Sequence, residues 1–184
     1  MSKAPSPQSS FHVAVIGAGM AGIACARTLR QAGLRVTVFE KSRGFGGRMA
    51  TRQSPFGSFD HGVQYFTVRD ARFRQALEST AAPVRPWSAN AVRVLDALGR
   101  VVESALPHRE PQWVATPGMS ALVREWAQPL LADEAVQLQW RVERIEQQTA
   151  QAPGQATHWQ LRGVDADGQP QLQRGFDAVL LAVP

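Results

Sequence analysis

The chain has 184 residues, of which 44% are hydrophobic and 19% are charged, and its formal net charge is +5. This composition is typical of a globular chain that can bury a sizeable core, and it excludes a wholly disordered one. The Lys and Arg residues are scattered, with no basic run and no basic helix face, so we do not expect a nucleic-acid partner.

Three further classes are disfavoured by what the sequence lacks. It has no apolar run of about eighteen residues, so a membrane span is not expected. Cys25 is the single cysteine, which excludes an internal disulfide and fits a reducing, cytoplasmic location. The histidines have no metal-ligand spacing, so a metal site is not expected either.

The first forty residues predict a tail followed by one crossover unit. Residues 1–10 are rich in Pro and Ser, which is typical of a disordered tail. Alternating β-branched residues over 12–16 predict a buried strand, and Ala- and Leu-rich residues over 20–31 predict a helix. Gly33 lies where a left-handed cap would end that helix. A second strand over 35–39 completes a βαβ unit and therefore a parallel sheet.

Later elements are shorter and alternate between helices and strands. Asp70 is a candidate N-cap for a helix that reaches about residue 79. A second helix is expected over 120–128, ending near Pro129 because proline cannot continue the helical hydrogen bonding. The predicted strands and hairpin arms lie at 92–95, 101–103, 113–115, 136–140, 142–145, 158–162 and 172–173, with a loop over 147–157.

The chain ends on an apolar run over 176–183, which predicts a buried parallel strand. A central strand of this kind is not expected to be the last element of a completed α/β domain. We therefore expect the chain to be the N-terminal portion of a longer protein.

The strongest motif is a glycine-rich turn between the first strand and the first helix. Gly17, Gly19 and Gly22 have the G-x-G-x-x-G spacing, which allows a tight turn, close backbone approach to a pyrophosphate and close helix–strand packing. The amides and dipole of the helix N-terminus then receive the phosphate charge. Glu40 ends the next strand, where a carboxylate can accept hydrogen bonds from a ribose. Together these residues predict a dinucleotide site.

A second glycine-rich loop follows at once, from Arg43 to Arg48. Its glycines bring backbone amides close to a ligand, while the two arginines supply fork-shaped donors for phosphate oxygens. A dehydrogenase that uses a nicotinamide cofactor does not normally need this second phosphate-binding loop. The pair of motifs therefore favours FAD.

These motifs resemble a known family. The first strand and turn with the R-G-x-G-G-R loop are similar to the FAD-dependent amine oxidase superfamily. The Asp-His-Gly-x-Gln-Tyr-Phe stretch within residues 59–66 resembles its renalase-like bacterial branch. The resemblance also includes Thr116 to Met119, 142–145 and 177–184. It implies an oxidase that passes a hydride from an amine or an isomeric dihydronicotinamide nucleotide to the flavin, and then passes electrons to oxygen.

The resemblance implies that residues 59–66 pass near the isoalloxazine and begin the substrate cavity. No catalytic residue is assigned, and His61 and Gln64 are the candidates for that role. An imidazole such as that of His61 can serve as an acid or base, although His61 can equally set the loop shape by a local hydrogen bond. The implied cofactor-binding residues are Gly17, Gly19, Met20, Ala21, Gly22, Glu40, Lys41, Arg43, Gly46, Gly47, Arg48, Met49, His61, Gly62 and Val142.

The predicted fold is thus α/β, with a Rossmann-like FAD/NAD(P)-binding domain and the start of an inserted mixed or antiparallel substrate-domain sheet. The expected division is an FAD-binding unit over 11–66, a partial substrate region over 67–130 and a return to the FAD-binding domain over 131–184. Two alternatives stay open: a dinucleotide-binding module or fragment without catalysis, and an NAD(P)-dependent dehydrogenase.

Overall fold

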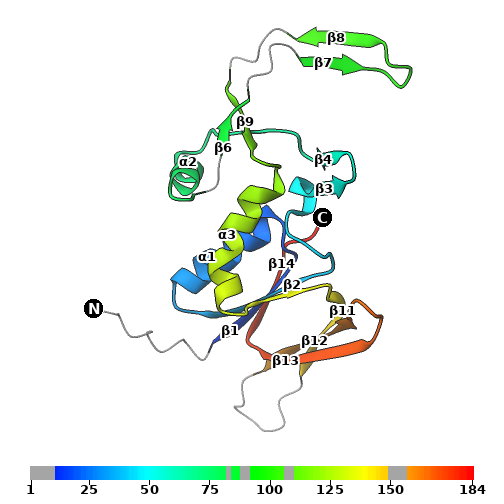
Figure 1. Cartoon of the computed structure of the whole chain (residues 1–184). Coiled ribbons are helices and arrows are strands. Elements are labelled where there is room, and N and C mark those ends of the chain that lie inside the picture. Colours follow the sequence, from blue (N-terminus) through cyan, green and yellow to red (C-terminus); the bar gives the residue numbers. More distant parts are fainter. Residues whose placement is uncertain (1–10, 82–83, 88–91, 106–109, 149–156) are drawn as a thin grey trace.

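The computed structural model describes residues 11–81, 84–87, 92–105, 110–148 and 157–184. Its centre is a four-stranded parallel sheet in the order β10-β2-β1-β14. The strands are β1 (His12–Ile16), β2 (Arg35–Glu40), β10 (Val136–Leu138) and β14 (Ala178–Leu181). Helices α1 (Met20–Gln31) and α3 (Ser120–Ala132) lie side by side against one face of this sheet (Figure 1).

The two faces of the parallel sheet bury two separate apolar clusters. Val13 and Val15 of β1 point to the helix side, where Leu122 and Trp126 of α3 join the same cluster. Ala14 and Ile16 of β1 point to the opposite face, where they cluster with Trp140, Leu161 and Phe176. Strand β1 is therefore buried on both faces, as the apolar run at its position predicts.

The second face is covered by a three-stranded antiparallel sheet, β11-β12-β13. Its strands are β11 (Arg141–Gln148), β12 (His158–Val164) and β13 (Pro170–Phe176). Phe39 of β2 packs against the Trp140 and Phe176 rings, with centroid distances of 4.8 Å and 5.8 Å. These aromatic contacts fix the antiparallel sheet on the parallel one.

The described residues between 47 and 115 form smaller elements above the carboxyl ends of β1 and β2 (Figure 1). A 3-10 turn (Gly47–Met49) precedes the hairpin of β3 (Thr51–Ser54) and β4 (Gly57–Asp60). Farther out lie α2 (Ala71–Glu78) and the three-stranded sheet β5-β9-β6. The hairpin β7–β8 is a separate two-stranded sheet that lies farther still from the body of the molecule (Figure 1). The remaining strands are β5 (Phe66–Thr67), β6 (Val84–Pro86), β7 (Val92–Leu95), β8 (Val101–Ala105) and β9 (Gln112–Ala115).

The predicted α/β class and the opening βαβ unit are confirmed, and the cap positions fit their helices. Gly33 follows α1 with a φ of +85°, and Asp70 accepts the Arg72 and Phe73 amides at the start of α2. The predicted tail at 1–10 and most of the predicted loop at 147–157 lie outside the described residues.

Three predicted boundaries are wrong. Helix α3 continues through Pro129 to Ala132, because Leu130 is fully buried and holds the last turn against the core. The strand predicted over 136–140 ends at Leu138, since Gln139 has a φ of +56°. The final strand spans only Ala178–Leu181, and Leu181 is 64% exposed in a strand that pairs with β1 on one side.

The base of the sheet contains a buried histidine, and it makes stability depend on pH. His12 Nε2 lies 2.9 Å from Thr37 Oγ1, its backbone N–H donates to Asp177, and its ring packs on Phe176. Burial, followed by the nearby Arg35, lowers the pKa of His12 below its ordinary value of 6.5. As the pH falls through 6.5, the unfolded chain takes up a proton that the folded chain does not, so stability is lost below that pH.

We expect the free energy of unfolding to fall on acidification by up to about 1.4 kcal/mol per pH unit for this one proton. His12→Gln should reduce that slope between pH 7 and pH 5 in urea titrations. His61→Gln, which makes the same substitution at an exposed histidine, is the matched control. Equal slopes for wild type and His12→Gln would contradict the assignment.

Candidate functional site

The first glycine turn lies at the carboxyl end of β1, where α1 begins. Gly17 has a φ of +109°, and its N–H donates to the Phe39 carbonyl at 2.8 Å. A Cβ on Gly22 would lie 1.9 Å from the Gly17 carbonyl oxygen, so the helix packs on the turn at backbone contact. The structure therefore requires glycine at both positions for the reasons that the motif predicts.

The N-terminus of α1 is left open. Within this fully described helix, the N-cap residue Gly19 makes no side-chain capping bond and the first turn carries no acidic side chain. The first amides of a helix have no intrahelical partner, and the positive end of its dipole attracts anions. Met20 and Ala21 form that first turn, which can therefore accept a phosphate.

Glu40 joins the end of β2 to the first glycine turn. Its side chain is 8% exposed. One carboxylate oxygen accepts the Ala18 amide at 2.7 Å, and the other accepts the Ser42 amide at 2.8 Å. The carboxylate is thus held beside the turn, next to the open end of α1.

The second glycine-rich loop packs directly on the first. The Gly46 N–H donates to the Ala18 carbonyl at 3.1 Å, and Gly46 bridges Gly19. A Cβ on Gly47 would lie 3.2 Å from the Gly19 Cα. Sequence reasoning predicted both loops but not this contact, which brings two sets of backbone amides to one end of the sheet.

Three cationic residues belong to the second glycine-rich loop or directly precede it. Lys41, Arg43 and Arg48 are all exposed, and none of them forms an ion pair with another described residue. Met49 is buried beneath them in the main core. The open helix end, the glycine backbones and these cations together fit a diphosphate, and the held carboxylate fits the adjoining ribose.

The segment after β4 is fixed to this second loop. The Val63 N–H donates to the Arg48 carbonyl at 2.8 Å, and a Cβ on Gly62 would lie 2.1 Å from that same oxygen. His61 and Gln64 flank the contact with exposed side chains, and neither makes a side-chain hydrogen bond to a described residue. The local hydrogen bond considered for His61 is therefore not seen within the described chain.

Val142 lies near the site but is not part of its glycine cluster. It pairs with Gly163 in the antiparallel sheet and is half-buried in the second apolar cluster. Two residues earlier, the Trp140 N–H donates to the Glu40 carbonyl at 2.9 Å. Val142 therefore lies two residues after a backbone contact with Glu40.

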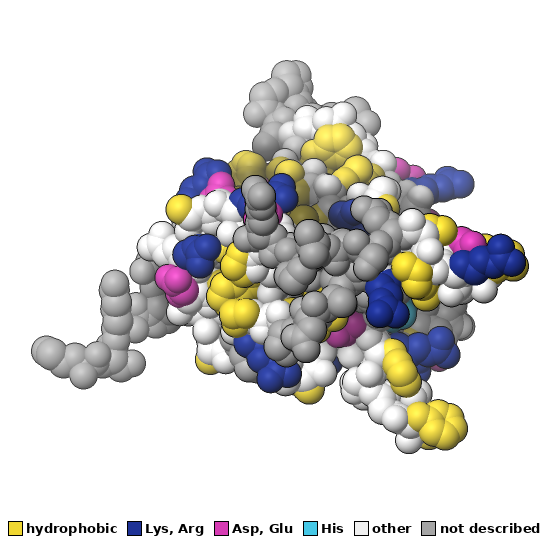
Figure 2. Space-filling view, turned by 90° about the horizontal axis from the view of Figure 1, so that it is seen from above, with side chains coloured by type: hydrophobic (Ala, Val, Ile, Leu, Met, Phe, Trp, Pro, Cys, Tyr) yellow, Lys and Arg dark blue, Asp and Glu magenta, His cyan; other side chains and the backbone are white. Residues whose placement is uncertain are grey.

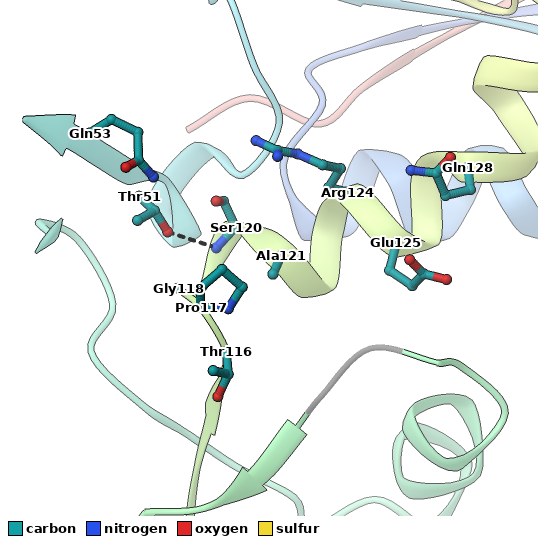
Figure 3. Close-up of a pocket in the computed structure, with 10 residues that line it drawn as sticks. All are labelled: Thr51, Gln53, Thr116, Pro117, Gly118, Ser120, Ala121, Arg124, Glu125 and Gln128. Atoms are coloured by element: carbon teal, nitrogen blue, oxygen red, sulfur yellow. Dashed lines mark hydrogen bonds between the residues drawn. The ribbon is translucent and has the colours of Figure 1, made fainter. Parts of the chain in front are cut away.

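Sequence reasoning did not identify a cavity at the start of α3. It has a volume of about 250 Å³ and lies between β3 and the first turns of α3 (Figure 3). Thr51, Gln53, Ser120 and Arg124 contribute polar groups to its wall. Thr51 has no distinguishing sequence pattern, because β3 is short and largely exposed.

Other classes of site gain no support from the described residues. No group of three or more His, Cys, Asp or Glu side chains there could hold a metal ion. Across the same residues, no helix combines the length and hydropathy that a membrane crossing requires. Figure 2 shows Lys and Arg side chains separated by other residue types on the face seen from above, rather than joined in one basic patch.

Comparison with known proteins supports the reading of the first motif. Residues 15–79 match the family model of the NAD(P)-binding Rossmann-like domain. Flavin-containing monooxygenase FMO GS-OX-like 2 of Arabidopsis thaliana is 30% identical over 186 residues, which are 96% of this chain and 36% of that protein. The putative L-amino-acid oxidase YobN of Bacillus subtilis (strain 168) is 51% identical over 49 residues, or 27% of this chain and 10% of that protein.

A solved structure of a redesigned putrescine oxidase superposes on this chain with a TM-score of 0.65 at 13% identity. The superposition includes 95% of this chain and 58% of the putrescine oxidase chain. At that identity the likeness concerns the fold alone. Three curated relatives match nearly the whole of this chain. The match covers only 36% to 38% of each relative's own length. The sheet order, the glycine turn and the matching family model agree that this chain contains a Rossmann-like NAD(P)-binding fold.

Proposed function

We propose that this chain is the cofactor-binding portion of an FAD-dependent oxidoreductase. The observation that carries the proposal is the contact between Gly19 and Gly46, beside the held carboxylate of Glu40. One glycine turn suffices for the pyrophosphate of a nicotinamide dinucleotide, whereas a second glycine loop at the same helix end favours FAD. The flavin-containing monooxygenases among the relatives support the same cofactor.

Each implied residue has a stated role in this proposal. Backbone amides of the first turn and of α1 hold the pyrophosphate, and the second loop approaches its other side. Glu40 accepts the adenosine ribose hydroxyls, and Val142 meets the adenine through its backbone. His61 and Gly62 lie toward the flavin ring. The other proposed cofactor-binding residues are Gly17, Gly19, Met20, Ala21, Gly22, Lys41, Arg43, Gly46, Gly47, Arg48 and Met49.

The reaction proposed is oxidation of a small molecule. When bound, FAD supplies two-electron redox chemistry, with oxygen as the final acceptor. The renalase-like resemblance of residues 59–66 favours an isomeric dihydronicotinamide nucleotide as substrate, and the wider superfamily favours an amine. A cytoplasmic location is part of this proposal and rests on the single cysteine.

The test is direct reconstitution of the purified protein with FAD. We expect the protein to retain a visible flavin absorption band after gel filtration. Anaerobic addition of isomeric dihydronicotinamide nucleotides should bleach that band faster than amines do. If only amines bleached the band, the renalase-like substrate assignment would be wrong, but the proposal of an FAD-dependent oxidoreductase would stand. Absence of a flavin band after incubation with FAD would overturn the cofactor assignment.

The two alternatives give different results in the same experiment. A binding module without catalysis would be stabilised against thermal unfolding by ADP-ribose, while no substrate bleached a bound flavin. The matched family model names NAD(P), which favours a dehydrogenase as the second alternative. That enzyme would bind NADH and retain no flavin.

A further inference from the structure

Two hydrogen bonds tie the hairpin β3–β4 to the start of α3, and a third, within the hairpin, joins the two side chains that accept them. Thr51 Oγ1 donates to Asp60 Oδ1 at 2.6 Å. The same Asp60 oxygen accepts the Met119 N–H at 2.9 Å, and Thr51 Oγ1 accepts the Ser120 N–H at 3.0 Å, the dashed line in Figure 3. We name these two residues the Thr51–Asp60 pair.

The pair provides a cap that α3 does not supply for itself. Within this fully described helix, Met119 at the N-cap makes no side-chain capping bond, and the first turn has no acidic residue. An anion and an acceptor at that end satisfy amides and complement the helix dipole. The approach is close, because a Cβ on Gly118 would lie 2.6 Å from Thr51 Oγ1.

Capping alone does not account for where the pair lies in the chain. Thr51 follows Arg48 by three residues, and Asp60 leads directly into Gly62 and Val63. Val63 is in turn hydrogen-bonded to the Arg48 carbonyl at 2.8 Å. The chain therefore leaves the second glycine loop, passes through the pair and returns to the same loop. The hydrogen bond between Thr51 and Asp60 joins the two ends of this segment, and the bonds to Met119 and Ser120 connect it to α3.

We propose that the Thr51–Asp60 pair is a positioning device that sets residues 61–63 against the second glycine loop, and thereby sets the protein surface that faces the cofactor. This inference rests on the proposed function for the identity of the cofactor. The pair itself touches neither cofactor nor substrate in this proposal. It acts through the backbone of Arg48 and Val63.

The test compares Thr51→Val, which removes both hydrogen bonds of the hydroxyl at nearly constant volume, with Thr51→Ser, which keeps them. We expect Thr51→Val to weaken FAD binding about ten-fold, because it loses two partly buried hydrogen bonds, and Thr51→Ser to stay within about two-fold of wild type. Thr51→Val should also change the visible circular dichroism of the bound flavin. The Val63 amide should exchange with solvent faster in Thr51→Val alone.

Asp70→Ala is the matched control, because it removes the cap of α2 in the same part of the chain. It should lower the Tm but leave the FAD Kd, the flavin spectrum and the Val63 exchange unchanged. If Thr51→Val behaves like Asp70→Ala in all three, the pair is only a helix cap and the proposal is overturned. Should Thr51→Val fail to fold, Asp60→Asn keeps the acceptor without its charge, and we expect a weakening of about three-fold.

The two proposals fail separately. If the wild-type protein binds no FAD, the proposed function is wrong, but the exchange rate of the Val63 amide still measures whether the pair holds this segment. Unchanged exchange in Thr51→Val and Asp60→Asn would then overturn the positioning role by itself.

Discussion

Gly22→Ala is expected to abolish FAD binding and to lower the free energy of unfolding by at least about 2 kcal/mol, as overpacking at a rigid backbone contact does. The added methyl carbon would lie 1.9 Å from the Gly17 carbonyl oxygen and 3.2 Å from the Ala182 Cβ. Neither neighbour is the end of a flexible side chain. To relieve the overlap, α1 must move away from the first turn, which displaces the helix end that receives the pyrophosphate.

Gly44→Ala is the control within the second glycine loop. A Cβ at Gly44 would meet no heavy atom within 4 Å, so the substitution should change neither stability nor FAD affinity appreciably. Urea unfolding and FAD titration of both variants provide the measurement. Loss of FAD binding in Gly44→Ala together with normal binding in Gly22→Ala would contradict the assignment of the first turn to the pyrophosphate.

The opening βαβ unit could be predicted because its determinants are local. Residues 12–40 have a regular apolar pattern, and the required glycines follow a fixed spacing. The same reasoning failed at Pro129, where local propensity predicts a helix end but burial of Leu130 continues the helix. Tertiary packing outweighs the lost hydrogen bond at that position.

The assembly of the site could not be predicted, because its contacts join segments far apart in sequence. The Gly46–Ala18 bond spans two motifs that each look complete alone. The bonds from Met119 to Asp60 and from Ser120 to Thr51 join residues 59 and 69 positions apart. Neither the exposed hairpin β3–β4 nor the start of α3 carries a pattern that indicates its partner.

Glu40→Ala is expected to weaken FAD binding at least about ten-fold and to destabilise the fold by about 1–3 kcal/mol, the usual cost of leaving a buried polar group without its partner. The variant leaves the buried Ala18 amide and the Ser42 amide without their acceptors. It also frees the contact between the first turn and the second loop. Glu40→Gln keeps one acceptor oxygen, so its effect on both quantities should be smaller.

The charge of Glu40 makes a further difference that alanine substitution alone does not test. A buried carboxylate beside the ribose should repel a 2′-phosphate, so wild type should bind ADP-ribose more tightly than its 2′-phosphorylated form. Glu40→Gln should narrow that preference, because the repelling charge is gone. Calorimetric titration with both nucleotides measures it. Glu143→Ala, which removes an exposed carboxylate paired with Arg141, should leave both affinities unchanged. An unaltered preference in Glu40→Gln would mean that Glu40 holds the turn but does not face the ribose.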